Sequence, residues 1–114
     1  MDIQGVTPVL PVEDVAEAAR VWAQLLGAQP TFVDGDRWAQ FDVAGLRIAL
    51  AGTDRVSDRA GVMIKVADLA AARAAALAAG LAVTEPSEGG HEIRCVVTAP
   101  GGWPVVLYAA KPVR

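Results

Sequence analysis

The chain carries one pattern of apolar and polar positions twice. In each copy, an apolar run is followed by Asp, by a segment with helical spacing and by Gly. The copies are TPVLPVEDVAEAARVWAQLLG from Thr7 to Gly27 and GVMIKVADLAAARAAALAAG from Gly61 to Gly80. Asp is a favoured N-cap and Gly a common residue just after a helix, so each copy predicts a strand and a capped helix. Because the copies are spaced by nearly half of the 114 residues, the pattern indicates one unit used twice.

Further strand-like runs follow both predicted helices. In the first half they are 30–33, 37–43 and 46–51, and in the second half they are 81–85, 91–98 and 103–109. The polar stretch 53–60 is typical of a linker. The sequence therefore predicts an α+β fold of two tandem βαβββ modules, about 1–52 and 61–114, within a single domain spanning 1–114.

The first predicted strand, from Ile3 to Val12, contains Pro8 and Pro11. Proline removes a backbone donor from the hydrogen-bond ladder on its side of the strand. Such a strand belongs at the edge of a sheet or in an arm.

The first predicted helix has a cap and an apolar stripe. Asp14 and Glu17 have the spacing of a capping box. Apolar residues then recur at helical spacing, which predicts the face that packs on the core: Val15, Ala18, Ala19, Trp22, Leu25 and Leu26.

Composition and charge exclude several classes of partner. The 54% hydrophobic content suffices for one core, and the net charge of −3, without a basic stripe, excludes a nucleic-acid partner. No apolar run approaches the roughly 20 residues that span a bilayer, and no cationic leader is present, so we expect no membrane partner and a cytoplasmic protein. The lone Cys95 excludes an intrachain disulfide and is expected to be a small buried hydrophobe.

The order of elements resembles a known superfamily. The succession βαβββ-βαβββ, the V-x-D-[VL] caps, LLG at the end of the first helix and the proline-glycine turn before the last strand are similar to the glyoxalase, bleomycin resistance and extradiol dioxygenase (vicinal oxygen chelate) superfamily. The resemblance covers nearly the whole chain and implies a curved mixed sheet. The opening GVTPVLPVEDV resembles bleomycin resistance proteins, which implies a homodimer with exchange of the first strand between its two subunits.

The resemblance also points to positions where a metal would be held. Enzymes of the superfamily usually bind a divalent metal through side chains of the first and fourth strands of each half. The corresponding positions here are Thr7, Ala49, Gly61 and Val106. None of them offers an imidazole or a carboxylate, and the chain has one His in total. We therefore expect no metal site and no cofactor.

Strand alternation separates the core face of each predicted sheet from a face that can bind a ligand. Leu10, Ile48, Ile64, Val105 and Leu107 fall on the helix side, as do Ala39, Phe41, Val43, Ile93, Cys95 and Val97 of the hairpin strands. The residues that alternate with them fall on the other side. The mixture there of apolar walls and a few polar groups is typical of a small-molecule pocket. The candidate ligand-binding residues are Trp38, Gln40, Asp42, Arg47, Met63, Glu92, Arg94, Trp103, Val106 and Tyr108.

Several candidates have a second interpretation. Trp38 either stacks on a flat ligand or covers the outer surface of the sheet. Arg47 and Arg94 either pair with Asp42 and Glu92 or bind an anionic substrate. Two residues at strand starts are also open: Trp103 is a pocket rim, a dimer contact or core, and His91 is an exposed turn residue or an acid–base group.

Two functions from different classes agree with this pattern. The first is a binding protein that sequesters an aromatic natural product or antibiotic, with no catalytic residue. The alternative is a metal-independent isomerase or lyase that uses Glu92, Asp42 or His91 for proton transfer. A dimeric protein with a vestigial pocket is a third possibility.

Overall fold

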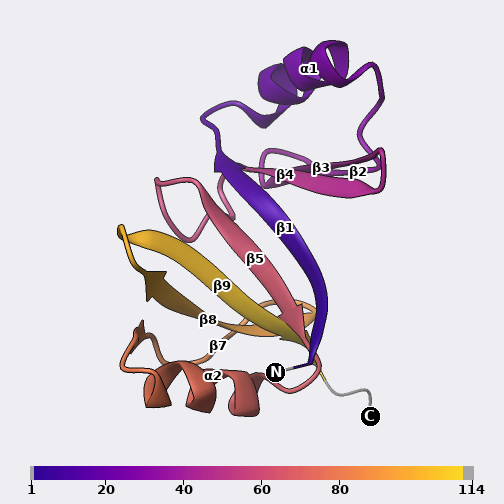
Figure 1. The fold of residues 1–114 in the computed structure, drawn as a ribbon. Coiled ribbons are helices and arrows are strands. Elements are labelled where there is room, and N and C mark those ends of the chain that lie inside the picture. The colour runs from indigo at the N-terminus through magenta and orange to yellow at the C-terminus, as the bar shows by residue number, and fades with distance from the viewer. Residues whose placement is uncertain (1, 112–114) are drawn as a thin grey trace. The chain divides into compact units, whose positions relative to one another are not determined.

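The computed structural model describes residues 2–111, which divide into two compact parts. The first half is Thr7–Ala60. The second half contains the described residues up to Val6 and those from Gly61 onward. The two halves are described in turn below (Figure 1).

The first half is a sheet with one helix on one face (Figure 1). The chain runs through β1 (Ile3–Pro11), α1 (Val15–Leu26), β2 (Phe32–Asp34), β3 (Trp38–Val43) and β4 (Leu46–Ala51). The strand order is β2-β3-β4-β1, with antiparallel pairing except that the end of β1 is parallel to β4.

The cap of α1 forms as the sequence predicted. Asp14 Oδ1 accepts a hydrogen bond from the Glu17 backbone N at 3.0 Å. At the other end, Gly27 has φ 64°, a conformation that costs glycine little. The buried cluster beneath the helix is Val15, Ala19, Ala39, Phe41 and Leu50, and Trp22 packs against it.

The prediction that Leu25 belongs to the apolar stripe of the first helix is wrong. Leu25 is 70% exposed. At about 100° of rotation per residue, Leu25 points roughly 80° away from the direction of Val15 and falls on the flank of the helix. Trp22 and Leu26 are closer to the direction of Val15, and both pack against the cluster.

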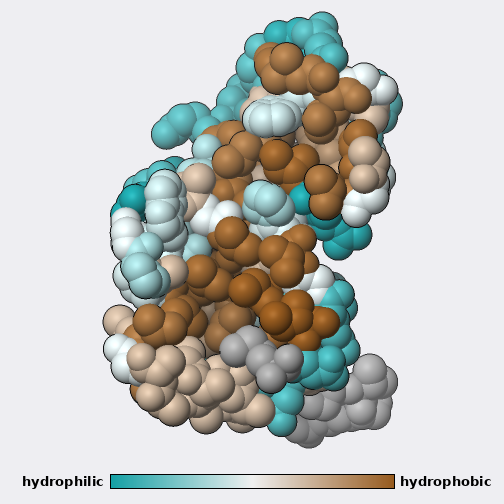
Figure 2. Space-filling model, in the orientation of Figure 1, coloured by the Kyte–Doolittle hydropathy of each residue, from teal (hydrophilic) through white to brown (hydrophobic). Residues whose placement is uncertain are grey.

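The second half has the same plan, with a helix against one face of its strands (Figure 1). Its elements are β5 (Gly61–Val66), α2 (Leu69–Ala78), β6 (Ala82–Val83), β7 (Ser87–Glu88), β8 (Glu92–Ala99) and β9 (Trp103–Ala110). β5 and β9 are parallel. β8 pairs antiparallel with β9 on one side and with β6 and β7 on the other. In each half, apolar residues gather between the helix and the strands that it covers (Figure 2).

Cys95 lies in the core of the second half, as predicted. It is buried in one cluster with Val66, Leu69 and Leu107. Burial raises the pKa of the Cys95 thiol, so the thiol stays protonated and acts as an apolar group.

β1 contributes to both halves. In the first half, Val9 pairs with Ala49 of β4. In the second half, the start of β1 lies next to β5, and Ala67 N donates to Asp2 O at 3.0 Å. β1 thus has a neighbouring strand in both halves, β4 in the first and β5 in the second, whereas the sequence predicted an edge strand or an arm. Exchange of this strand between two copies stays a prediction.

The strand predicted over 81–85 is shorter than expected, and the loop predicted over 86–90 contains β7. Thr84 Oγ1 accepts the hydrogen bond of Val96 N at 2.8 Å, and Thr84 O instead accepts from Arg73 Nε at 3.0 Å. The side chain of Thr84 therefore replaces a backbone acceptor and ends the regular ladder. Among the described residues, no helix is long and apolar enough to cross a lipid bilayer.

Candidate functional site

In the first half, the candidate residues lie on the face of the sheet that points away from α1. On β3, Ala39 and Phe41 belong to the core under the helix. The alternate residues Trp38, Gln40 and Asp42 therefore lie on the other face. Their partners on β4 are Ala51, Ala49 and Arg47, in that order. The predicted register of these strands is confirmed.

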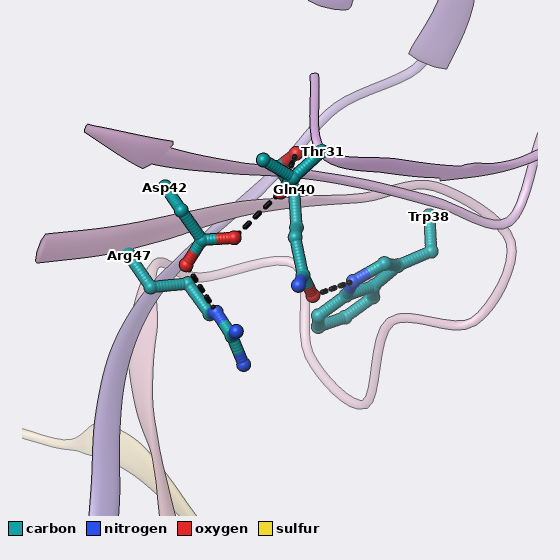
Figure 3. Close-up of polar contacts among 5 residues, drawn as sticks. All are labelled: Thr31, Trp38, Gln40, Asp42 and Arg47. Atoms are coloured by element: carbon teal, nitrogen blue, oxygen red, sulfur yellow. Dashed lines mark hydrogen bonds and ion pairs between the residues drawn. The ribbon is translucent and has the colours of Figure 1, made fainter.

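A hydrogen-bonded network connects the polar residues of this face (Figure 3). Thr31 Oγ1 donates to Asp42 Oδ2 at 2.5 Å, and Arg47 Nε donates to Asp42 Oδ1 at 2.7 Å. Trp38 Nε1 donates to Gln40 Oε1 at 3.4 Å. Arg47 thus pairs with Asp42, as one of the two interpretations predicted.

The network keeps Asp42 ionised. The hydrogen bond from Thr31, followed by that from Arg47, holds the pKa of Asp42 below its ordinary value of 3.8. Because both carboxylate oxygens accept hydrogen bonds, Asp42 is a weak base. Its role in this arrangement is to position Arg47.

We expect Asp42→Asn to lower stability at neutral pH and to lose this effect in acid. Because the pKa of Asp42 is lower in the folded state than in the unfolded state, the ionised carboxylate stabilises the fold at pH values above the ordinary pKa of 3.8. This contribution disappears as the pH falls through the lower pKa of the folded protein. Urea midpoints of both proteins on either side of pH 3.8 measure the effect. A difference between the two proteins that does not depend on pH would contradict it.

In the second half, the candidate residues also lie opposite the helix. Met63 of β5 pairs with Val106 of β9, which pairs in turn with Val96 of β8. One step along the same face, Tyr108 lies between Lys65 and Arg94. The face therefore combines apolar and polar residues, as alternation predicted, and the structure shows them in two adjacent rows.

Three further candidates lie on β8, on β9 or next to them. Glu92 Oε1 is 3.7 Å from Arg94 Nη1, so the predicted internal pairing is present here too. Trp103 is half exposed and is therefore not core, while the rim and dimer-contact interpretations remain. His91 is exposed in the loop before β8, and its carbonyl accepts from Lys111 N at 3.1 Å.

The residues at the positions of the superfamily's metal ligands do not fit a metal. Ala49 and Val106 carry only aliphatic groups, and Thr7 supplies one neutral hydroxyl. A Cβ at Gly61 would lie 2.3 Å from Pro104 O, so no side chain fits there without movement of β9. Within residues 2–111, no three His, Cys, Asp or Glu side chains gather as metal ligands would.

The stretch predicted to be a linker is an ordered loop in the first half. Arg55 Nη1 donates to Gly52 O at 3.0 Å and to Val12 O at 3.3 Å, and its Nε donates to Asp58 Oδ1 at 2.8 Å. A depression of about 500 Å³ is lined by Gly52, Thr53, Arg55, Val56, Ser57 and Asp58. Sequence reasoning missed it, although the Arg55–Asp58 spacing was a local signal.

Comparison with known proteins identifies the fold. No protein-family model matches the chain, and no curated protein matches it either. Many solved structures are similar to this chain, among them three that match over most of both chains. The first, described as an NAD-dependent benzaldehyde dehydrogenase from Legionella pneumophila, has a TM-score of 0.84 and 15% identity over 93% of this chain and 99% of its own.

The second structure carries the name of the predicted superfamily, and the third is an enzyme with the same fold. A glyoxalase/bleomycin resistance protein/dioxygenase superfamily member from Vibrio splendidus has a TM-score of 0.69 and 15% identity over 94% of this chain and 98% of its own. Methylmalonyl-CoA epimerase from Mycobacterium tuberculosis has a TM-score of 0.63 and 17% identity over 97% and 89%. At these identities the shared property is the fold, and the predicted fold is confirmed.

Proposed function

We propose that this chain, which has the fold of the glyoxalase/bleomycin resistance/dioxygenase superfamily, binds a planar aromatic small molecule without converting it. The observation that carries the proposal is the position of Trp38. It lies on the face opposite α1, outside the core cluster, and is only half-buried. A large aromatic ring placed outside a core is a common feature of ligand sites.

The hydrogen bond of Trp38 supports stacking on its ring. Gln40 accepts the indole N–H at the ring edge, and this contact does not use the ring faces. It also fixes the orientation of the side chain, so that less conformational freedom is lost when a ligand binds.

The environment of Asp42 supports a binding function and not a proton-transfer function. Its carboxylate accepts hydrogen bonds from Thr31 and Arg47, and its lowered pKa makes it a poor proton acceptor. The alternative, a metal-independent isomerase or lyase, therefore depends on Glu92 or His91. An aromatic natural product or antibiotic is the proposed ligand class, and a homodimer is the proposed assembly.

Two tryptophan substitutions test the proposal. Trp38→Ala is expected to weaken binding of an aromatic ligand by about 1 to 3 kcal/mol, since the lost contact is a buried aromatic anchor. Its effect on folding is expected to be small. Trp22→Ala is the matched control: it removes packing under α1 and is expected to cost about 3 kcal/mol of stability with little change in affinity.

A thermal-shift screen of aromatic antibiotics would supply the ligand, and calorimetry and urea unfolding would then measure both variants. Unchanged affinity of Trp38→Ala would remove Trp38 from the site. Conversion of the ligand to a product by the wild-type protein would favour the enzymatic alternative.

A further inference from the structure

We infer that the ligand of the first half is an aromatic acid whose carboxylate is bound by Arg47. This inference rests on the proposed function and adds the chemical class of the ligand. It follows from the donors of Arg47 that remain available, from the spacing between Arg47 and Trp38, and from the exposure of the residues on this face.

Arg47 is fixed at one edge only. Its Nε donates to Asp42 Oδ1 at 2.7 Å, and Asp42 is in turn held by Thr31. With the part of the chain that the structure describes, Arg47 forms no other hydrogen bond or ion pair. The N–H groups on Nη1 and Nη2 therefore remain available, in a planar fork that matches a carboxylate.

The charge of the pair favours a singly charged ligand. Asp42 already neutralises one unit of charge and would repel a second anion with high charge density. A carboxylate spreads one negative charge over two oxygens and can bind both terminal nitrogens of Arg47. We therefore place a carboxylate, and not a phosphate dianion, at this position.

The spacing along the strands sets the size of the ligand. Trp38 and Asp42 are separated by four residues of β3, or about 13 Å, and Arg47 lies opposite Asp42. Between the two ends lies the half-buried side chain of Gln40, and Ala49 opposite it is fully buried, so a ligand that reaches both ends passes over Gln40. Figure 3 shows the indole of Trp38 and the guanidinium of Arg47 on the same side of the sheet, with Gln40 between them.

Exposure indicates how the ligand is oriented. Trp38 and Gln40 are half-buried, whereas the side chains of Asp42 and Arg47 are 38% and 47% exposed. The charged end of the site is thus the open end. A planar acid with two rings would place its rings toward Trp38 and keep its carboxylate near solvent, where a charge loses the least hydration.

Biphenyl-4-carboxylate and biphenyl-4-carboxamide form a matched pair of probes, because they share size and rings but differ in charge. We expect calorimetry on the whole protein at neutral pH to show that the acid binds at least about tenfold more tightly, the effect of hydrogen bonds to a charged group. Arg47→Gln is expected to abolish this preference. Arg47→Lys, which keeps the charge but not the fork, should retain only part of it.

Arg20→Gln is the control, because Arg20 is an exposed arginine of α1 that also pairs with a carboxylate, Glu17. Its preference for the acid should equal that of the wild type. Equal binding of acid and amide by the wild type, or a preference that survives Arg47→Gln, would overturn the inference and leave the proposed function standing. If neither probe binds and the antibiotic screen also fails, both are overturned.

Discussion

Phe41→Ala is expected to lower the free energy of unfolding by about 3 to 5 kcal/mol. Phe41 is completely buried and is the largest side chain in the chain's described part with less than 2% exposure. It packs in one cluster with Val15, Ala19 and Leu50, between α1 and the sheet. The loss combines the transfer of a large apolar group with the cavity that remains, because these neighbours belong to a helix and strands that cannot collapse freely.

Phe32→Ala is the matched control, since it removes the same atoms from the edge strand β2. Phe32 is 53% exposed and lies outside the cluster. We expect its replacement to change stability by no more than about 0.5 to 1 kcal/mol. Urea unfolding followed by tryptophan fluorescence measures both variants. Equal losses from the two phenylalanines would show that the core of the first half is not where the structure places it.

Gly52→Ala is expected to destabilise the protein by about 3 kcal/mol or more, because no space exists for a methyl group. A Cβ at this position would lie 2.1 Å from Asp36 O and 2.4 Å from Val15 Cγ2. The two neighbours cannot easily move. Gly52 N donates to Arg37 O at 2.9 Å and Thr53 N to Asp36 O at 3.0 Å, while Val15 is buried at the start of α1.

Gly90→Ala is the corresponding control. No heavy atom outside its immediate neighbours lies within 4 Å of a Cβ at Gly90, and its φ is not in the left-handed region. Alanine there is expected to be neutral or to stabilise by at most about 1 kcal/mol, through the reduced entropy of the unfolded chain. The same urea titrations apply. A Gly52→Ala protein as stable as the wild type would mean that the loop after β4 does not approach Asp36 so closely.

Much of the fold could be predicted because its signals are local. The caps at Asp14 and Asp68 are readable from neighbouring residues, since each accepts a hydrogen bond from the backbone N three positions on. Alternation along β3 likewise places Phe41 and Trp38 on opposite faces of the sheet. These patterns act over a few residues and do not require knowledge of the tertiary structure.

The rest depends on contacts between distant residues. The loop after β4 is ordered by Arg55 reaching Val12 O, and β6 ends early because Thr84 Oγ1 takes the N–H of Val96. For the site, alternation placed Asp42 and Arg47 on one face but left two partners open for Arg47. The rotamer that directs Nε toward Asp42 forms the ion pair and leaves the terminal nitrogens available, and a linear pattern does not specify a rotamer.

The division of β1 has a consequence for the order in which the chain becomes structured during synthesis. Residues up to Val6 leave the ribosome before the first half does, yet the strand beside them, β5, begins only at Gly61. The first half can close soon after Ala51 has emerged, because its pairing partners lie within one continuous stretch. The segment up to Val6 must therefore wait, without its neighbour, while residues 7–60 are translated. The waiting segment is short and carries the polar residues Asp2 and Gln4, which suits it, since unpaired strand edges are otherwise prone to associate with other chains.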